Sequence, residues 1–341
     1  MDIINCLRAL NKFVDLGFSA GRLPVYDYWR VLISASLWNT SAEAVSGKGL
    51  PSADCVLGYI GNNGWQEVES YFRDVIGHTI KIAKQQNWFS RPVLCSIDFH
   101  DDLYYGLDCF GVVGCKSKLG TNKCFRVATL EVCEAGRRFT IAVMPVFKET
   151  SKVEVLDYLV REARKYIKIR CLLLDRGFYS INVFQALQSL KLRYIVCAKK
   201  TKKMLKAIEN KTSIRYTLKN PEDSFTVDLV AYCPNEKECW VYATSLQSKP
   251  ETIAYTYKKR WGIETGYKSK NKYNANTTTR NYTIRLFYIL LGIVLYNLWV
   301  LANLIADYKT ILKLNHKAEY TTLVTIFQFK RHAIQQLADY G

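Results

Sequence analysis

One stretch decides the fold class: Cys171-Leu172-Leu173-Leu174-Asp175-Arg176-Gly177-Phe178-Tyr179. It has the pattern of a short apolar strand that ends in an acid and a turn, and helical spacing begins at Ser180. Asp175 therefore stands at the carboxyl end of a buried strand, where open α/β sheets place their chemistry. The pattern predicts an α/β fold with a functional edge at Asp175.

Two further acids have matching contexts. Asp98 directly follows the apolar run from Val93 to Ile97, and Glu264 lies in a segment from Tyr257 with the length and polarity of a helix. The next acids after Asp98, Asp101 and Asp102, are outer candidates because they lie beyond the end of the apolar run. Carboxylate oxygens are hard ligands suited to Mg²⁺ or Mn²⁺. Three separated acids on strand, strand and helix have the layout of a metal-dependent nuclease site.

The order of elements outlines four regions. Residues 1–90 carry helical periodicity, and within them Ala42 to Ile60 fits either a helix-turn-helix or an ordinary helical hairpin. Residues 91–198 have the pattern β-β-β-α-β-α-β, with the first three strands at Pro92 to Asp98, Lys123 to Cys133 and Arg138 to Phe147. Residues 199–247 are basic and rich in short strands, and residues 248–341 are mainly helical. The sequence thus predicts an α/β core with a β-rich insertion between helical ends.

The chain is strongly basic. It has 48 Lys and Arg against 30 Asp and Glu, a net charge of +18, which favours a polyanionic partner such as nucleic acid or an anionic membrane surface. Between Lys191 and Lys219 there are ten basic residues and one acid, Glu209. A basic run is often only a solvated face, but this one adjoins the strands around Asp175, so we expect phosphate contacts from Lys199, Lys200, Lys202, Lys203 and Lys206.

The cysteines and apolar segments bear on the compartment. Eleven cysteines are scattered without a C-x-x-C pair, so we expect reduced, mostly buried thiols. The N-terminal residues lack the pattern of a signal peptide, which favours a cytoplasmic, nucleoid-associated protein. Leu286 to Ile305 is long and apolar enough to span a bilayer, but Asn297 and Asn303 interrupt it. A buried core helix is the favoured interpretation, and we expect no membrane partner.

The strand order and acid positions resemble the ribonuclease-H-like fold. The spacing Tyr257-x2-Arg260-x3-Glu264 also resembles the Y-(2)-R-(3)-E signature of prokaryotic insertion-sequence transposases with a DDE triad, particularly the IS-four group. Leu174 to Tyr179 is similar to their second-aspartate motif, and Asn281 to Asn297 resembles the helical segment after their glutamate. The resemblance covers about residues 90 to 305.

This resemblance implies roles for particular residues. Asp98, Asp175 and Glu264 would be catalytic and would hold two Mg²⁺ (or Mn²⁺) ions. Spacings of three and four place Tyr257, Arg260 and Glu264 on one helical face, so Arg260 and Tyr257 could bind a phosphate. The family signature also asks for a lysine seven residues after the glutamate. That position is Asn271 here, and either neighbour, Lys270 or Lys272, could substitute and contact DNA.

Two tryptophans are candidate stacking platforms for unpaired bases. They are Trp240 and Trp261, for which core packing is the alternative. With these contacts the resemblance implies cleavage of DNA strands at transposon ends and strand transfer into target DNA, by a dimer or larger synaptic complex. A catalytically silent DNA-binding protein derived from such an enzyme is the alternative.

Overall fold

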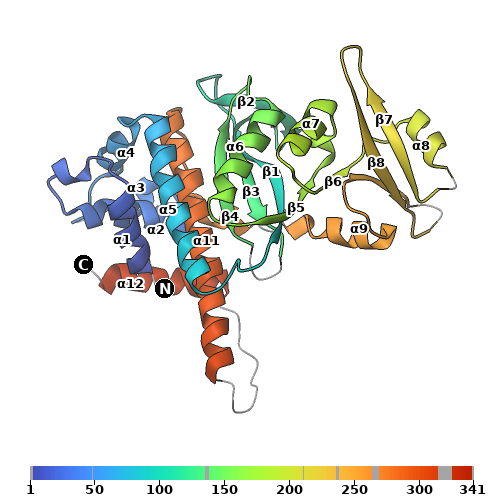
Figure 1. Cartoon of the computed structure of the whole chain (residues 1–341). Helices are drawn as coiled ribbons and strands as arrows, with labels where there is room; N and C mark the ends of the chain where they lie inside the picture. The colour runs from blue at the N-terminus through green and yellow to red at the C-terminus, as the bar shows by residue number, and fades with distance from the viewer. Residues whose placement is uncertain are drawn as a thin grey trace.

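The computed structural model describes residues 3–47, 49–134, 138–209, 211–235, 238–262, 269–313 and 325–339. A mixed β-sheet lies in the middle of the molecule, a helical bundle lies at one end, and a β-hairpin with a short helix lies at the other (Figure 1). The two described ends of the chain both belong to the helical bundle.

Helices from both ends of the sequence form the bundle. They are α1 (Ile3–Phe13), η1 (Phe18–Ala20), α2 (Val25–Trp38), α3 (Ala42–Val45), α4 (Ala53–Gly61), α5 (Trp65–Gln85), α11 (Tyr282–Lys313) and α12 (Ile326–Asp339). The ring of Phe287 on α11 lies 5.2 Å from that of Phe72 on α5 and 6.1 Å from that of fully buried Trp29 on α2. The helical periodicity expected over residues 1–90 is confirmed, and these helices share their core with the C-terminal ones.

The sheet has nine strands. They are β1 (Val93–Tyr104), β2 (Val112–Lys118), β3 (Thr121–Val132), β4 (Thr140–Val146), β5 (Ile169–Leu174), β6 (Tyr194–Cys197), β7 (Ser213–Lys219), β8 (Ser224–Tyr232) and β9 (Trp240–Thr244). Their order is β2-β3-β1-β5-β6-β9-β8-β7, with β4 pairing on β3. The β1–β5 and β5–β6 pairs are parallel, and the other pairs are antiparallel.

Two features of this sheet differ from the sequence prediction. Strand β2 was not expected, so the order before the first core helix is four strands and not three. Strand β1 also continues past Asp98 to Tyr104, because β3 pairs with it along that whole length while its parallel pairing with β5 stops at Ile97. Asp98 therefore follows the end of the parallel pairing and not the end of its strand.

The remaining helices flank the sheet. They are α6 (Lys152–Arg164), η2 (Arg176–Phe178), α7 (Ile181–Ser189), α8 (Lys202–Ile208) and α9 (Pro250–Lys258), whereas η3 (Asn271–Tyr273) packs against α2 and α11 of the bundle. Ser151 caps α6, because its hydroxyl accepts a hydrogen bond from the backbone N–H of Glu154 at 3.1 Å. The β-rich stretch predicted between 199 and 247 forms β7 to β9, and it continues the central sheet because β9 pairs with β6.

The apolar segment near the C-terminus is a core helix of this fold. Among the described residues, the stretch Tyr282–Ile305 of α11 is long and apolar enough to cross a membrane, and 94% of its most apolar window is buried inside the protein. Asn297 is fully buried, and its amide exchanges two hydrogen bonds, of 2.9 and 2.8 Å, with the backbone of Thr140. The polar residue that interrupts the apolar run thus holds α11 to strand β4.

One expectation about the cysteines is wrong. Cys233 and Cys239, which follow β8 and precede β9, are joined by a disulfide. They come together because the antiparallel pairing of β8 with β9 brings the ends of those strands side by side. The other nine cysteines are free, and five of them, Cys6, Cys95, Cys124, Cys133 and Cys171, are buried.

Candidate active site

Asp98 and Asp175 follow neighbouring residues of two parallel strands. Ile97 of β1 lies opposite Leu174 of β5, so the residue that follows each of these partners is an aspartate at the point where the parallel pairing ends. Asp175 then caps η2, because its Oδ1 accepts a 2.9 Å hydrogen bond from the N–H of Gly177. A Cβ on Gly177 would lie 2.9 Å from that same oxygen, so a larger residue there would displace the Asp175 carboxylate. The structure thus brings together two of the three predicted acids.

The setting of Asp98 disfavours its charge. Burial raises the pKa of its carboxyl to about 6, and the nearby charges of Asp175 and Glu131 act in the same direction. A 2.9 Å hydrogen bond from the N–H of Phe99 and the charge of Arg260 oppose that rise. Two carboxylates that share a poorly solvated site repel each other, and a cation bound between them would relieve that repulsion.

Helix α9 leads into the arginine next to this pair. Nη1 of Arg260 lies 3.3 Å from Oδ2 of Asp98, and the guanidinium stands 5.8 Å from the ring of Tyr257. The Tyr257 side chain is buried, and its hydroxyl donates a 3.2 Å hydrogen bond to the carbonyl of Leu174. The expected phosphate contact of Tyr257 is therefore corrected: its hydroxyl holds α9 against the end of β5. The third predicted acid, Glu264, lies outside the described residues.

Behind Asp98 lies a buried ion pair that the sequence did not predict. The ammonium of Lys270 contacts Oε1 of Glu131, and the two side chains are 3% and 1% exposed. Thr129 donates a 3.0 Å hydrogen bond to the same carboxylate oxygen, and Lys270 donates a 3.3 Å hydrogen bond to the Thr140 hydroxyl. Burial lowers the pKa of Lys270, while the charge of Glu131 raises it.

This ion pair corrects the role expected of Lys270. Its ammonium points into the protein, where a DNA phosphate cannot reach it, so Lys270 ties the chain after the undescribed residues 263–268 to strand β3. Lys272 is exposed, and its carbonyl accepts a hydrogen bond from Lys330. A charged residue inside the apolar strand around Glu131 was the sequence signal for this pair.

The predicted DNA-contacting lysines lie on the surface. The five residues Lys199, Lys200, Lys202, Lys203 and Lys206 are exposed, and the last three are on α8. Lys200 also bonds to the carbonyl of Cys239. Helix α8 begins at a cap formed by the Thr201 hydroxyl, which accepts a 3.2 Å hydrogen bond from the N–H of Met204. The helix stands beside β7, at the end of the sheet away from the helical bundle (Figure 1).

The two tryptophans differ in their surroundings. Trp261, directly after Arg260, is 59% exposed, so its ring is accessible next to the aspartate pair. Trp240 is half-buried and stacks on Tyr232 at a centroid distance of 6.2 Å. This contact favours the packing role for Trp240 over stacking on a base.

A comparison with protein families identifies the class. The model of the transposase DDE domain matches residues 122–298, just over half of the chain. The chain belongs to this family. The matched range contains Asp175 and Glu264 but begins after Asp98, so the assignment of Asp98 depends on its position next to Asp175.

A solved structure has a similar fold. It is the cryo-EM structure of the piggyBac transposase synaptic complex with hairpin DNA, with a TM-score of 0.59 and 15% sequence identity over 92% of this chain and 70% of that one. A comparison with curated proteins gave no significant match. The family and the fold agree on a DDE transposase domain.

Proposed function

We propose that this transposase cleaves DNA strands at transposon ends and transfers them into target DNA, with Asp98, Asp175 and Glu264 as the acids that bind two Mg²⁺ or Mn²⁺ ions. The observation that carries the proposal is that Asp98 and Asp175 lie next to each other where the parallel pairing of β1 and β5 ends, in a poorly solvated setting. The strand order also supports a ribonuclease-H-like core, with β2 as an additional edge strand.

The donors present at this site fit a hard divalent cation. Both side chains are carboxylates, which Mg²⁺ and Mn²⁺ prefer. Burial and, to a smaller extent, the charge of Asp175 raise the pKa of Asp98, and bound cations would oppose this rise by favouring the ionised form. Such ions activate an attacking water or 3′-hydroxyl and stabilise the oxygen that leaves phosphorus. Glu264 enters on the resemblance to the Y-(2)-R-(3)-E group, because its position is not described.

The residues in and just after α9 have separate tasks in this proposal. The bond from Tyr257 to the Leu174 carbonyl fixes the helix beside the end of β5, and Arg260 orients Asp98. The guanidinium of Arg260 also supplies positive charge where the scissile phosphate would lie, and its planar fork suits a phosphate. Exposed Trp261 offers a ring on which a base next to the cut could stack.

DNA is the proposed partner of the basic surface. The net charge of +18 provides a field that attracts DNA, and the exposed lysines of α8 with Lys199, Lys200 and Lys272 provide phosphate contacts. We propose assembly as a dimer or larger synaptic complex, because two transposon ends have to be joined. We also propose that the protein belongs to the IS-four group and acts at the nucleoid.

A donor plasmid tests this function. It carries a marker between the DNA segments that flank the coding sequence, and it is incubated with the purified chain in Mg²⁺, in Mn²⁺ and in EDTA. We expect nicks or double-strand breaks at the segment ends with either metal and none in EDTA or with Asp175→Asn. Specific binding to the ends without cleavage in any metal would reject the enzyme and support the catalytically silent DNA-binding protein.

A further inference from the structure

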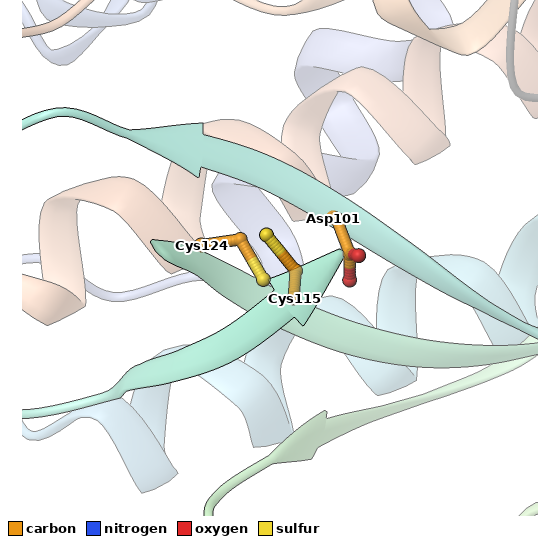
Figure 2. Close-up of side chains that lie close together, drawn as sticks. All are labelled: Asp101, Cys115 and Cys124. Carbon is orange, nitrogen blue, oxygen red and sulfur yellow. The ribbon is translucent and has the colours of Figure 1, made fainter. Parts of the chain in front are cut away.

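Three side chains with metal-binding atoms meet at the edge of the sheet away from α8. They are Asp101 of β1, Cys115 of β2 and Cys124 of β3. Figure 2 shows the two cysteine side chains pointing toward each other, with the Asp101 side chain next to them. The two sulfur atoms and a carboxylate oxygen all lie within 4.8 Å of one another. Cys124 is buried, while Asp101 and Cys115 are partly exposed.

The strand register explains why these three residues meet. Cys124 lies opposite Leu103 on β1 and opposite Val113 on β2. Alternate residues of a strand share a face, so Asp101 and Cys115, each two positions from those partners, project on the same face as Cys124. Asp98 is an odd number of positions from Asp101 and projects on the opposite face. This cluster is therefore separate from the candidate active site.

We infer that Asp101, Cys115 and Cys124 form a binding site for a thiol-seeking divalent cation, with Zn²⁺ as its natural occupant. Two cysteines and a carboxylate are ligands that zinc takes, and a solvent molecule completes a four-coordinate site on the half-exposed side of Cys115. Two soft sulfur donors also distinguish this group from a cluster of acids alone, because thiolates select zinc over Mg²⁺ and Ca²⁺.

The geometry requires only a small adjustment. Ligand bonds of about 2.0–2.3 Å around a tetrahedral ion place neighbouring donors roughly 3.5–3.8 Å apart, so the cluster has to contract by at most about 1 Å. The β2–β3 ladder is irregular between Gly114 and Lys118, and Cys115 lies within that interval. The backbone of this edge strand is therefore not held by a regular ladder at the residue that has to move.

Arg126 holds the Asp101 carboxylate in place and leaves its oxygens able to bind a metal. Its Nε and Nη2 lie 2.5 and 2.9 Å from the two oxygens of Asp101. Each carboxylate oxygen has two lone pairs, so a lone pair remains on each for a metal. Ligating carboxylates are commonly held by such an outer partner. The charges also balance, because two thiolates, Asp101, Arg126 and one divalent cation sum to zero.

The two metal sites of this protein would select different ions. The carboxylates at Asp98 and Asp175 suit hard Mg²⁺ or Mn²⁺, whereas a site with two sulfur atoms suits zinc or cadmium. A metal bound at the thiol site would crosslink β2, the last strand at this edge of the sheet, to β3 and β1. The site does not rest on the proposed cleavage reaction, and its test does not use activity.

Metal binding by the whole chain tests this inference. The purified protein, reduced and stripped with EDTA, is titrated with Cd²⁺ while the ultraviolet thiolate-to-metal absorption is recorded, and Zn²⁺ affinity is measured by competition with a coloured chelator. We expect one tight equivalent that persists in the Cys233→Ser/Cys239→Ser background, which removes the two thiols that reduction releases from their disulfide. The variants Cys115→Ser and Cys124→Ser should bind at least about a hundredfold more weakly, and Asp101→Asn about tenfold more weakly.

Matched controls separate this site from the other thiols. Cys55→Ser and Cys109→Ser remove free cysteines that are exposed or half-buried, and they should leave the tight equivalent unchanged. Because Cys124 is buried and its variant could fail to fold, half-exposed Cys115 decides the result, with circular dichroism in EDTA as the check on folding. Unchanged binding by Cys115→Ser would overturn the inference. So would unchanged binding by Asp101→Asn, or the absence of a tight equivalent in the reduced parent.

Discussion

Two charged clusters on one face of the sheet are built in opposite ways. At the candidate active site, the like charges of Asp98 and Asp175 stand side by side, and their repulsion helps to raise the pKa of Asp98. Deeper in the sheet, the opposite charges of Glu131 and Lys270 contact each other and are almost fully buried. Thr129, opposite Asp98 in the β1–β3 register, donates to Glu131 and links the two clusters.

This difference indicates that the two aspartates serve cation binding, whereas the Glu131–Lys270 ion pair stabilises the fold around them. Like charges held together destabilise a fold, and such strain is typical of a site that binds a cation. A buried ion pair whose polar atoms are hydrogen-bonded is self-sufficient and fixes the position of its two elements. The pair here joins β3 to the chain six residues after Glu264, so it can hold that segment near the aspartates. If this is correct, variants of the aspartates should lose cleavage and variants of the ion pair should lose stability.

The largest effect is expected for the aspartates. Asp175→Asn keeps an oxygen that can accept from the Gly177 N–H but removes the charge, as Asp98→Asn does for its partner. Each should reduce metal-dependent cleavage by roughly 10²- to 10³-fold or more, a range typical for the loss of one charge-stabilising group. The measurement is the initial rate of plasmid cleavage in Mg²⁺.

Stability and DNA binding are the controls for these aspartate variants. We expect Asp175→Asn to unfold at the parental temperature or above it, because a repulsion is removed. DNA affinity should change little, since neither side chain is assigned to a phosphate. Cleavage by either variant at close to the parental rate would remove that aspartate from the metal site.

The supporting pair should respond in stability. Lys270→Met leaves the Glu131 charge buried and unpaired, which typically costs about 3–5 kcal/mol. The double variant Glu131→Gln/Lys270→Met should recover most of that loss, because no charge remains uncompensated. Urea unfolding of the parent, the single variants and the double variant provides the cycle. Parental stability in Lys270→Met, with weaker DNA binding, would instead return Lys270 to the DNA surface.

The sequence predicted the aspartates better than their support. An apolar run followed by an acid is a local pattern, so Asp98 and Asp175 could be proposed without knowledge of the fold, although β1 continues past Asp98. The partner of Glu131 is 139 residues away, and no local pattern connects the two. Tyr257 shows the same limit, since a helical face predicts where its side chain points but not that the Leu174 carbonyl lies there.

The missing strand has a different cause. Strand β2 includes the polar run Lys116-Ser117-Lys118 and lies at the edge of the sheet, so its burial alternates too weakly to stand out in the sequence. The β-rich stretch was recognised, but its pairing with β6 is a long-range contact that turn signals do not specify. Local propensity thus predicted most elements, and the register that assembles them came from the structure.

Arg260 has two candidate roles, one in cleavage and one as a structural ion-pair partner of Asp98. Arg260→Lys keeps the charge next to Asp98 but loses the planar fork, so we expect cleavage to fall roughly ten- to hundredfold, the equivalent of about 1.5–3 kcal/mol for a charged hydrogen bond. The unfolding midpoint should change little. Normal cleavage, or a variant that fails to fold, would assign Arg260 to the supporting class with Glu131 and Lys270.

The lysines of α8 should affect binding and not chemistry. Replacing Lys202, Lys203 and Lys206 with glutamate should weaken DNA binding on all sequences alike, and the salt slope should fall by about 0.9 for each phosphate that the variant no longer neutralises. Affinity is measured over a series of salt concentrations. Glutamates at Lys81 and Lys84 on α5, at the opposite end of the sheet in Figure 1, are the matched control. Equal weakening per reversed charge in the triple variant of α8 and the double variant of α5 would show a general charge effect without a DNA path at α8.

The smallest expected effect is a pH dependence of stability that belongs to Asp98. Its pKa is raised from 3.8 to about 6 in the folded protein, so the folded state binds the proton more tightly than the unfolded state does. Stability from this group is therefore present at low pH and is lost as pH rises from about 4 through 6. Asp98→Asn lacks that loss, so in EDTA its unfolding midpoint should rise relative to the parent between pH 4 and pH 7. Mg²⁺ should narrow the difference at pH 7, because bound cations favour the charged carboxylate of the parent. A difference that is constant with pH would mean that Asp98 is well solvated, and the contrast with the buried ion pair would then no longer hold.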